Sequence, residues 1–196
     1  MRLVLGLGNP GDRYAGTRHN VAWRVLDALA DRWQGTDVSV GGVYLARQAR
    51  FAGGLVELMK PLTFMNLAGE AVDRWVREHD GQPPEDLLVV SDDVYLPVGT
   101  LRLRRRGSSG GHRGLESVDR TLGGPDFPRL RLGVGAAESS AELREHVLDT
   151  FSPEEQGTVA EMVLRAADVV ECWAAEGIVA AMNRFNRRAG KEVPES

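Results

Sequence analysis

The sequence predicts an α/β fold, a single domain over residues 1–196 in which helices flank a twisted, mixed β-sheet. Strand-like and helix-like apolar patterns follow one another along the chain. An unbroken apolar run at 87–90 is typical of a strand that is covered on both faces. An alternating run at 43–51 is followed by Gly53-Gly54 and a second apolar run, which favours a β-hairpin. Strands joined by helices together with one hairpin indicate a mixed sheet.

The first half of the chain holds further elements marked by turn and cap residues. Apolar residues at 2–7 ahead of Asn9-Pro10-Gly11 predict a strand that ends in a turn. Asn20 can cap a helix that follows it, because apolar residues then recur at helical spacing. Thr63 can cap a second helix in the same way.

The middle of the chain combines arginines with glycines. Leucines at 101 and 103 alternate with arginines, so a strand there would place Arg102, Arg104 and Arg106 on one face. The glycine-rich segment 107–114 predicts a turn into a short helix, where free backbone N–H groups could bind an anion. The run 129–134 predicts another strand.

The C-terminal helices are expected from about residue 152. Ser152-Pro153-Glu154-Glu155 combines a cap serine, a proline at the first position and a glutamate at the third, which is a strong helix start. The helix should stop near Gly177. Its inward face is predicted from residues at helical spacing, namely Val159, Met162, Val163, Ala166, Val170 and Trp173.

Composition indicates an ordinary globular protein. Of 196 residues, 42% are hydrophobic and 27% are charged, which argues against disorder. There is no apolar run of the length that a membrane span needs, and the N-terminal apolar run is broken by glycine too early for a signal peptide. A lone cysteine, Cys172, is expected to pack in a core under reducing conditions. These features predict a cytoplasmic protein.

Charge is unevenly distributed along the chain. The net charge is −4, yet the segment 102–131 holds eight arginines against Glu116, Asp119 and Asp126. A local basic patch on an acidic protein suits a partner whose phosphates are gripped at one place. The alternative is a solvated face without a partner.

Residues 6–11 match the pattern G-x-G-x-x-G, which in dinucleotide-binding proteins leads from a strand directly into a helix. Here Pro10-Gly11-Asp12 continues as a loop, and helical periodicity begins only near Val21. A Rossmann-type oxidoreductase is therefore a weak alternative.

Polar side chains of catalytic type lie where predicted strands end. Asn9 follows the first strand, His19 lies beside a helix start, and Asp92 comes shortly after the apolar run at 87–90. A carboxylate can orient an imidazole and stabilise its charged form, so His19 and Asp92 could act as a base and its partner. Asn66 opens another helix and supplies a second amide. Each residue taken alone also has a purely structural explanation.

Five segments in order along the chain resemble the bacterial peptidyl-tRNA hydrolases. They read LGLGNPG…Y…TRHN, KPLTFMNLAG, SDDVYLP, GSSGGHRGL and RLRLGVG. The resemblance extends to the C-terminal helices and covers nearly the whole chain. It implies an esterase that cleaves the bond between a peptide and its tRNA and that needs no cofactor or metal. Because members of this family are mostly monomers, it also implies a monomer.

The resemblance also implies roles for individual residues. His19 would be the catalytic base, Asp92 its partner, and Asn9 and Asn66 would bind the ester and stabilise the oxyanion. The expected substrate-binding residues are Tyr14, Phe64, Met65, Asn66, His112 and Arg113. Contacts with tRNA phosphates are expected from Arg102, Arg104 and Arg131. The partner would be the acceptor end of a peptidyl-tRNA that has left or stalled on a ribosome.

The chain departs from these relatives at two positions. Arg113 stands where they usually have asparagine, so a side chain that only donates replaces one that also accepts. Tyr95 stands where they usually have an acid. These departures leave open a catalytically impaired relative that binds RNA. A metal mechanism could use His19, His112 and Asp92, although no short spacing typical of zinc ligands supports it.

Overall fold

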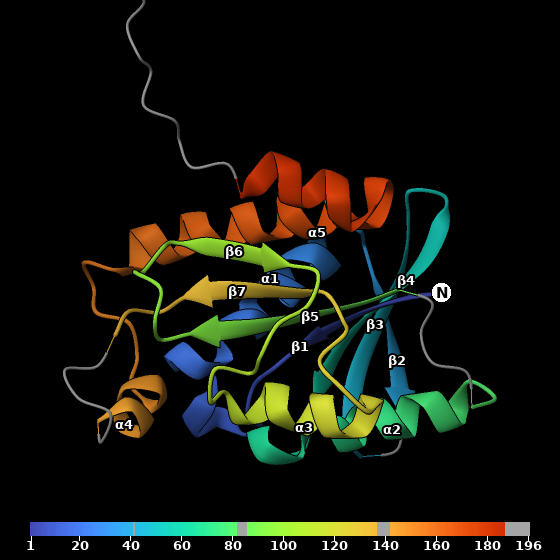
Figure 1. Cartoon of the computed structure of the whole chain (residues 1–196), viewed down its shortest axis with the longest axis horizontal. Coiled ribbons are helices and arrows are strands. Elements are labelled where there is room, and N and C mark those ends of the chain that lie inside the picture. Colours follow the sequence, from blue (N-terminus) through green and yellow to red (C-terminus); the bar gives the residue numbers. More distant parts are fainter. Residues whose placement is uncertain (41, 82–85, 137–141, 187–196) are drawn as a thin grey trace, which may run out of the picture.

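Seven strands form one mixed sheet in the order β2-β3-β4-β1-β5-β7-β6 in a computed structural model, which describes residues 1–40, 42–81, 86–136 and 142–186 (Figure 1). β1 pairs in parallel with β4 and β5, and β5 pairs in parallel with β7. β2, β3 and β6 run antiparallel to their neighbours. The strands are β1 Arg2–Gly6, β2 Thr36–Val40, β3 Tyr44–Phe51, β4 Gly54–Pro61, β5 Asp86–Asp93, β6 Leu101–Arg104 and β7 Arg129–Gly133.

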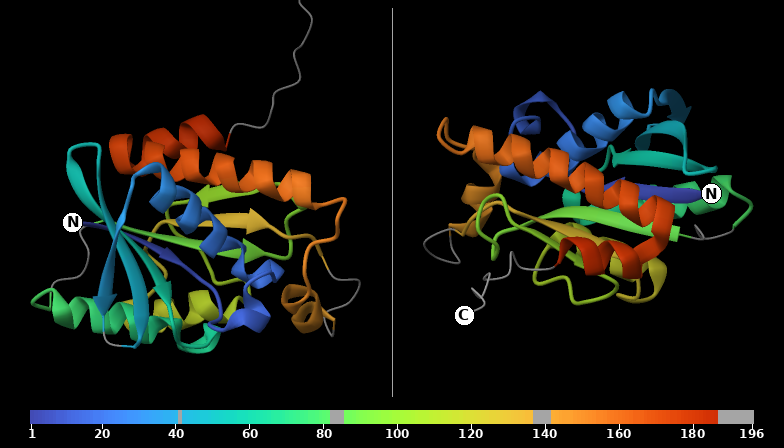
Figure 2. Two further views of the ribbon diagram at one scale, coloured as in Figure 1. Left: turned by 180° about the vertical axis from the view of Figure 1, so that it is seen from behind. Right: turned by 90° about the horizontal axis from the view of Figure 1, so that it is seen from above.

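Helices cover both faces of this sheet, so the described part of the chain forms three layers (Figure 2). α1 and α5 pack on one face, and α2 and α3 pack on the other. Each face has its own apolar core, and each large aliphatic side chain buried there stabilises the fold by roughly 1.5–3 kcal/mol. The helices are α1 Val21–Arg32, α2 Ala68–Glu78, α3 Arg113–Leu122, α4 Leu143–Leu148 and α5 Gln156–Phe185, with 3-10 turns η1 Asp12–Tyr14, η2 Arg18–Asn20 and η3 Met65–Leu67.

The carboxyl ends of the four parallel strands meet at one edge of the sheet (Figure 1). The chain leaves β1 toward η1 and η2, leaves β4 toward η3, and leaves β7 toward α4. The end of β5 itself carries Asp92 and Asp93. Sites of open α/β sheets lie at this edge, and this topology therefore brings segments distant in the sequence together there.

The predicted α/β fold with a mixed sheet is confirmed, and its hairpin is β3–β4. Strand β2 and helix α4 were not predicted. The expected strand of arginines is shorter than predicted, because β6 ends at Arg104 and Arg106 lies beyond it. The predicted inward face of the C-terminal helix is buried throughout. Gly177 marks a kink with φ 85°, a left-handed conformation that favours glycine, and the helix continues beyond it.

Two predicted helix caps are wrong. Asn20 stands at the N-cap of α1, but its side chain makes no cap hydrogen bond and instead binds the backbone of Asn9. Thr63 is not the cap of α2, which begins five residues later, and its hydroxyl is buried without a hydrogen-bond partner among the described residues. At residue 152 the expected capping box is half present. The backbone N–H of Ser152 donates to the Glu155 carboxylate at 2.8 Å, while α5 begins at Gln156.

No helix within the described ranges is long and apolar enough to cross a membrane.

Candidate active site

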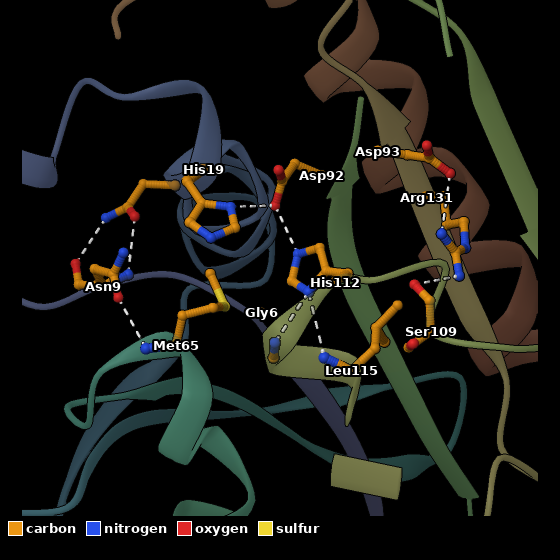
Figure 3. Close-up of polar contacts among 12 residues, drawn as sticks. Gly6, Asn9, His19, Met65, Asp92, Asp93, Ser109, His112, Leu115 and Arg131 are labelled. Atoms are coloured by element: carbon orange, nitrogen blue, oxygen red, sulfur yellow. Dashed lines mark hydrogen bonds and ion pairs between the residues drawn. The ribbon is translucent and has the colours of Figure 1, made fainter. Parts of the chain in front are cut away.

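Asn9 is held in one orientation by three hydrogen bonds (Figure 3). Its backbone N–H donates to Asn20 Oδ1 and its carbonyl accepts from Asn20 Nδ2, both at 2.9 Å. Its side-chain oxygen accepts the backbone N–H of Met65 at 2.8 Å. Because Oδ1 is occupied, the side chain offers its Nδ2 hydrogens to the cleft that it lines. Asn9 is thereby set as a hydrogen-bond donor.

Asp92 binds two histidines through one oxygen (Figure 3). His19 Nδ1 lies 2.7 Å and His112 Nε2 lies 2.8 Å from Asp92 Oδ1, and the two rings are tilted with centroids 5.2 Å apart. The carboxylate is 1% exposed, whereas His19 reaches the cleft. The predicted pairing of His19 with Asp92 is thus present in the structure, and His112 joins it.

The hydrogen bonds of His112 assign its tautomer. Its Nδ1 accepts the backbone N–H groups of Gly114 and Leu115 at 3.1 and 3.3 Å, capping α3. A nitrogen that accepts cannot carry the proton of a neutral imidazole, so Nε2 carries it and donates to Asp92. These contacts also occupy two of the backbone N–H groups that the sequence suggested for anion binding.

Asp92 assigns the tautomer of His19 as well. A carboxylate accepts hydrogen bonds, so Nδ1 of His19 carries a proton and its Nε2 keeps a lone pair. Burial lowers the pKa of His19, but the negative charge of Asp92 and its hydrogen bond raise it, and the net result is a raised pKa. Burial raises the pKa of Asp92, yet the two imidazoles outweigh it and bring this pKa below its usual range. Asp92 therefore stays ionised beside a more basic His19.

Nitrogen-15 NMR of labelled protein at neutral pH should show opposite tautomers for these two histidines. We expect the Nε2–H form for His112 and, in its neutral state, the Nδ1–H form for His19, because Asp92 accepts from both rings. The Asp92→Asn variant is the reference. Its spectrum is used to assign the imidazole signals of the two histidines, and their preference for one tautomer should be weaker in it. Observation of a His112 ring protonated on Nδ1 would contradict the cap at α3.

A cleft of about 650 Å³ opens onto His19, with its walls made by segments from all the parallel strand ends. It is lined by the six residues to which the resemblance assigns substrate binding, namely Tyr14, Phe64, Met65, Asn66, His112 and Arg113. Phe64 is 53% exposed and Asn66 and Arg113 are exposed, so three of these side chains are open to a ligand.

Met65 lies mostly beneath the surface of the cleft. It is 5% exposed and packs against the start of α3. A Cβ at Gly114 would approach Met65 Sδ to 2.5 Å, so the absence of a side chain at Gly114 leaves room for Met65. Met65 therefore shapes the floor of the cleft and links η3 to α3.

The arginines of β6 and β7 lie on one face but in different environments. The register places Arg102 opposite Arg131 and Arg104 opposite Arg129. Arg102 and Arg104 are exposed. Arg131 lines the cleft, where it binds Asp93 at 3.1 Å and the carbonyls of Ser108 and Ser109 (Figure 3). Its side chain is only 12% exposed, so much of its charge is already partnered.

Arg129 is the one member of this set with no outward surface. It is fully buried, stacks over Phe127 at 4.2 Å and donates to the carbonyl of Pro125 at 2.8 Å. The count of arginines in the sequence therefore overstates the basic surface, because Arg129 serves the fold.

Several cleft residues were missed by reasoning from the sequence. Helix α4 forms one wall of the cleft. Arg13 and Tyr95 also line it, and Tyr95 is 67% exposed. The α4 segment carried no motif, and only the fold shows that the exit of β7 returns to η2. Its cleft-lining residues are Leu143, Arg144, Val147 and Leu148.

His19, Asp92 and His112 also meet the spacing of a metal site, since one potential ligand atom from each lies within 4.8 Å of the others. In the observed arrangement, however, both histidine nitrogens nearest to Asp92 donate hydrogen bonds to it. Each would have to lose its proton before it could bind a metal.

Known proteins with the same sequence pattern and fold are peptidyl-tRNA hydrolases. A family model described as peptidyl-tRNA hydrolase matches residues 3–193. The peptidyl-tRNA hydrolase of Chloroflexus aggregans is 43% identical over 95% of this chain and 99% of its own, and that of Symbiobacterium thermophilum is 45% identical over 94% and 98%. A crystal structure of the Acinetobacter baumannii peptidyl-tRNA hydrolase superposes with a TM-score of 0.87 at 32% identity, covering 95% and 94% of the two chains.

These matches span the whole domain, and they support neither the dinucleotide-binding oxidoreductase nor the impaired RNA-binding protein. The first of these also conflicts with the fold, because 3-10 turns and not an α-helix follow residues 6–11. The chain belongs to the peptidyl-tRNA hydrolase family.

Proposed function

We propose that this protein hydrolyses the ester bond between a peptide and the 3′ ribose of its tRNA, with a water molecule activated by His19. The observation that carries the proposal is the orientation of two groups at one cleft. His19 presents an unprotonated Nε2, and Asn9 presents the Nδ2 hydrogens of its side chain. A base and a donor so placed can act on the two sides of an ester carbonyl.

In the first step, water gives a proton to His19 Nε2 as its oxygen attacks the ester carbonyl. The carbonyl oxygen becomes negative, and the Nδ2 groups of Asn9 and Asn66 donate hydrogen bonds to it. Asp92 stabilises the imidazolium that forms on His19. The intermediate then expels the 3′ oxygen of the ribose, which takes the proton back from His19. The products are a free peptide carboxyl group and a tRNA with an intact 3′ end.

Base catalysis of this kind contributes roughly 10²–10⁴-fold, and one oxyanion donor contributes about 10²–10³-fold. An ester is more easily cleaved than an amide, so these two contributions serve without a covalent nucleophile. His112 is a positioning residue: its Nε2 donates to Asp92, and its Nδ1 accepts a backbone N–H at the start of α3.

Incubation with an N-acetyl-aminoacyl-tRNA tests the function directly. Release of the acetylated amino acid is expected at an unchanged rate in EDTA, because the proposed base is a side chain. Free aminoacyl-tRNA serves as the control substrate and should be cleaved far more slowly. Activity lost in EDTA and restored by zinc or magnesium would favour metal-bound water at the three-residue cluster. No release from any blocked substrate would favour the RNA-binding alternative.

The tRNA phosphates are expected at the exposed arginines of β6, next to the cleft. Replacing Arg102 or Arg104 with alanine should each reduce the slope of log K against log salt by about one unit. Arg131→Ala should also weaken binding, with an added effect on the cleft because the ion pair with Asp93 is lost. Filter binding or anisotropy with deacylated tRNA over a salt series measures these slopes. A tRNA affinity independent of salt would leave the β6 arginines as a solvated face.

The proposal includes a monomer that acts in the cytoplasm on peptidyl-tRNAs that leave ribosomes. The lone, buried Cys172 supports the reducing compartment.

A further inference from the structure

Three arginines with free guanidinium groups surround the mouth of the cleft. Arg13 comes from η1, Arg113 from the first turn of α3, and Arg144 from α4. All three side chains are exposed, and within the described ranges none has an ion-pair or hydrogen-bond partner. Arg13 lies over the ring of Tyr14 at 4.5 Å, which orients it and leaves its charge unpaired. Three separate elements thus bring cations to one opening.

The carboxylates that line the same cleft are already engaged. Asp92 accepts from both histidines, and Asp93 binds Arg131 at 3.1 Å and the backbone N–H of Tyr95 at 2.8 Å. Asp12 and Glu142, which are close in sequence to Arg13 and Arg144, do not line the cleft. The free arginines therefore have no counter-charge inside the cleft among the residues that the structure describes.

Arg113 and Tyr95 bring no negative charge to the cleft. Arg113 contributes a guanidinium and Tyr95 contributes a phenol, so neither residue supplies a carboxylate. Both side chains line the cleft, and Tyr95 is 67% exposed. Neither position therefore offsets the charge of the three free arginines.

We propose that the mouth of the cleft binds an anionic group of the substrate close to the scissile ester, and that this group is an acidic side chain of the peptide. A guanidinium binds a carboxylate by paired, charge-assisted hydrogen bonds. A phosphate of the tRNA 3′ end offers the same chemistry. The proposal rests on the proposed function and adds a preference for peptidyl-tRNAs whose peptide carries an anionic group at this place.

The test uses ligands that bind but are not hydrolysed. N-acetylglutamate and N-acetylglutamine are joined through an amide to 3′-amino-3′-deoxyadenosine, which has no phosphate, and to the corresponding CCA trinucleotide, which has two. Dissociation constants are measured by calorimetry for the wild type and for Arg13→Gln, Arg113→Gln and Arg144→Gln. Arg165→Gln is the matched control, because Arg165 is an exposed arginine of α5 that does not line the cleft.

The wild type should bind the glutamyl adenosine about twofold to fivefold more tightly than the glutaminyl one. The ratio should approach one in Arg13→Gln, Arg113→Gln and Arg144→Gln and stay unchanged in Arg165→Gln. If a phosphate is the anion, the wild type should bind the glutamyl and glutaminyl adenosines equally. The tighter binding of the CCA ligands should then disappear in the cleft variants. That result would overturn the peptide carboxylate as the ligand and keep the anion site.

The proposal of an anion site fails if the cleft variants and Arg165→Gln show the same ratio of glutamyl to glutaminyl affinity and the same increase in affinity from the CCA phosphates. Hydrolysis of N-acetylglutaminyl-tRNA by the wild type is measured separately. Its absence would count against the proposed function, whereas the dissociation constants would still decide the anion site.

Discussion

Replacing His19 with alanine is expected to lower kcat for peptidyl-tRNA hydrolysis by about 10²–10⁴-fold, which is the usual contribution of a general base. The affinity for tRNA should change little, because His19 meets the substrate at the reacting water, whereas the β6 arginines proposed to bind the phosphates do not line the cleft. A loss in kcat at constant KM identifies an interaction made in the transition state. Single-turnover kinetics on an N-acetyl-aminoacyl-tRNA measures the step.

A matched histidine substitution separates this effect from a loss of folding. His79 stacks on Trp75 with ring centroids 3.9 Å apart, outside the cleft, so His79→Ala removes an imidazole without touching the proposed base. Thermal unfolding and tRNA binding of both variants complete the comparison. A His19→Ala protein with wild-type kcat would show that another group activates the water.

The location of the site could be predicted from the sequence because of where the strands end. Asn9 and Asp92 follow or end apolar runs, and the carboxyl ends of parallel strands meet at one edge of the sheet. Local pattern was therefore enough to bring these two residues to one site. His19 needed the resemblance as well, since a histidine beside a helix start has common structural explanations.

What the sequence could not supply are contacts between side chains from distant segments. Asparagine is a common helix-capping residue, yet the side chain of Asn20 makes two hydrogen bonds to the backbone of Asn9, and only the fold shows that it does so instead of capping α1. His112 lines the cleft, as the resemblance implied, and it also caps α3 with one nitrogen and holds Asp92 with the other, which the sequence did not indicate. Such choices depend on which polar groups become buried together.

The arginines illustrate a second limit of local pattern. Alternation along β6 and β7 places Arg102, Arg104, Arg129 and Arg131 on one face. Periodicity does not say which part of that face is covered. Here Arg129 is fully buried while Arg102 and Arg104 are exposed. One guanidinium is buried and its neighbours are exposed because of how the layers pack on each other. The pattern of a single strand does not contain that information.

Asp92→Asn is expected to lower kcat by an amount on the order of 10²–10⁴-fold, because the charge that stabilises the His19 imidazolium is lost. The amide can also turn its Nδ2 hydrogens toward His19, and Nδ1 must then accept. That exchange would move the proton to Nε2 and remove the lone pair that receives the proton of water. The fold should persist, since both imidazoles can remain neutral beside a neutral amide.

The pH profile of Asp92→Asn gives a sign that distinguishes this mechanism from simple damage. The base works when His19 is neutral, so activity falls as pH drops through its pKa. Asp92 raises that pKa, and its neutralisation must lower it. The acidic limb of kcat/KM should therefore move to lower pH while the plateau falls. Asp93→Asn is the matched control, because it removes a cleft carboxylate bound to Arg131 and leaves the His19 contact intact. An acidic limb that stays in place in Asp92→Asn would mean that His19 is not the titrating base.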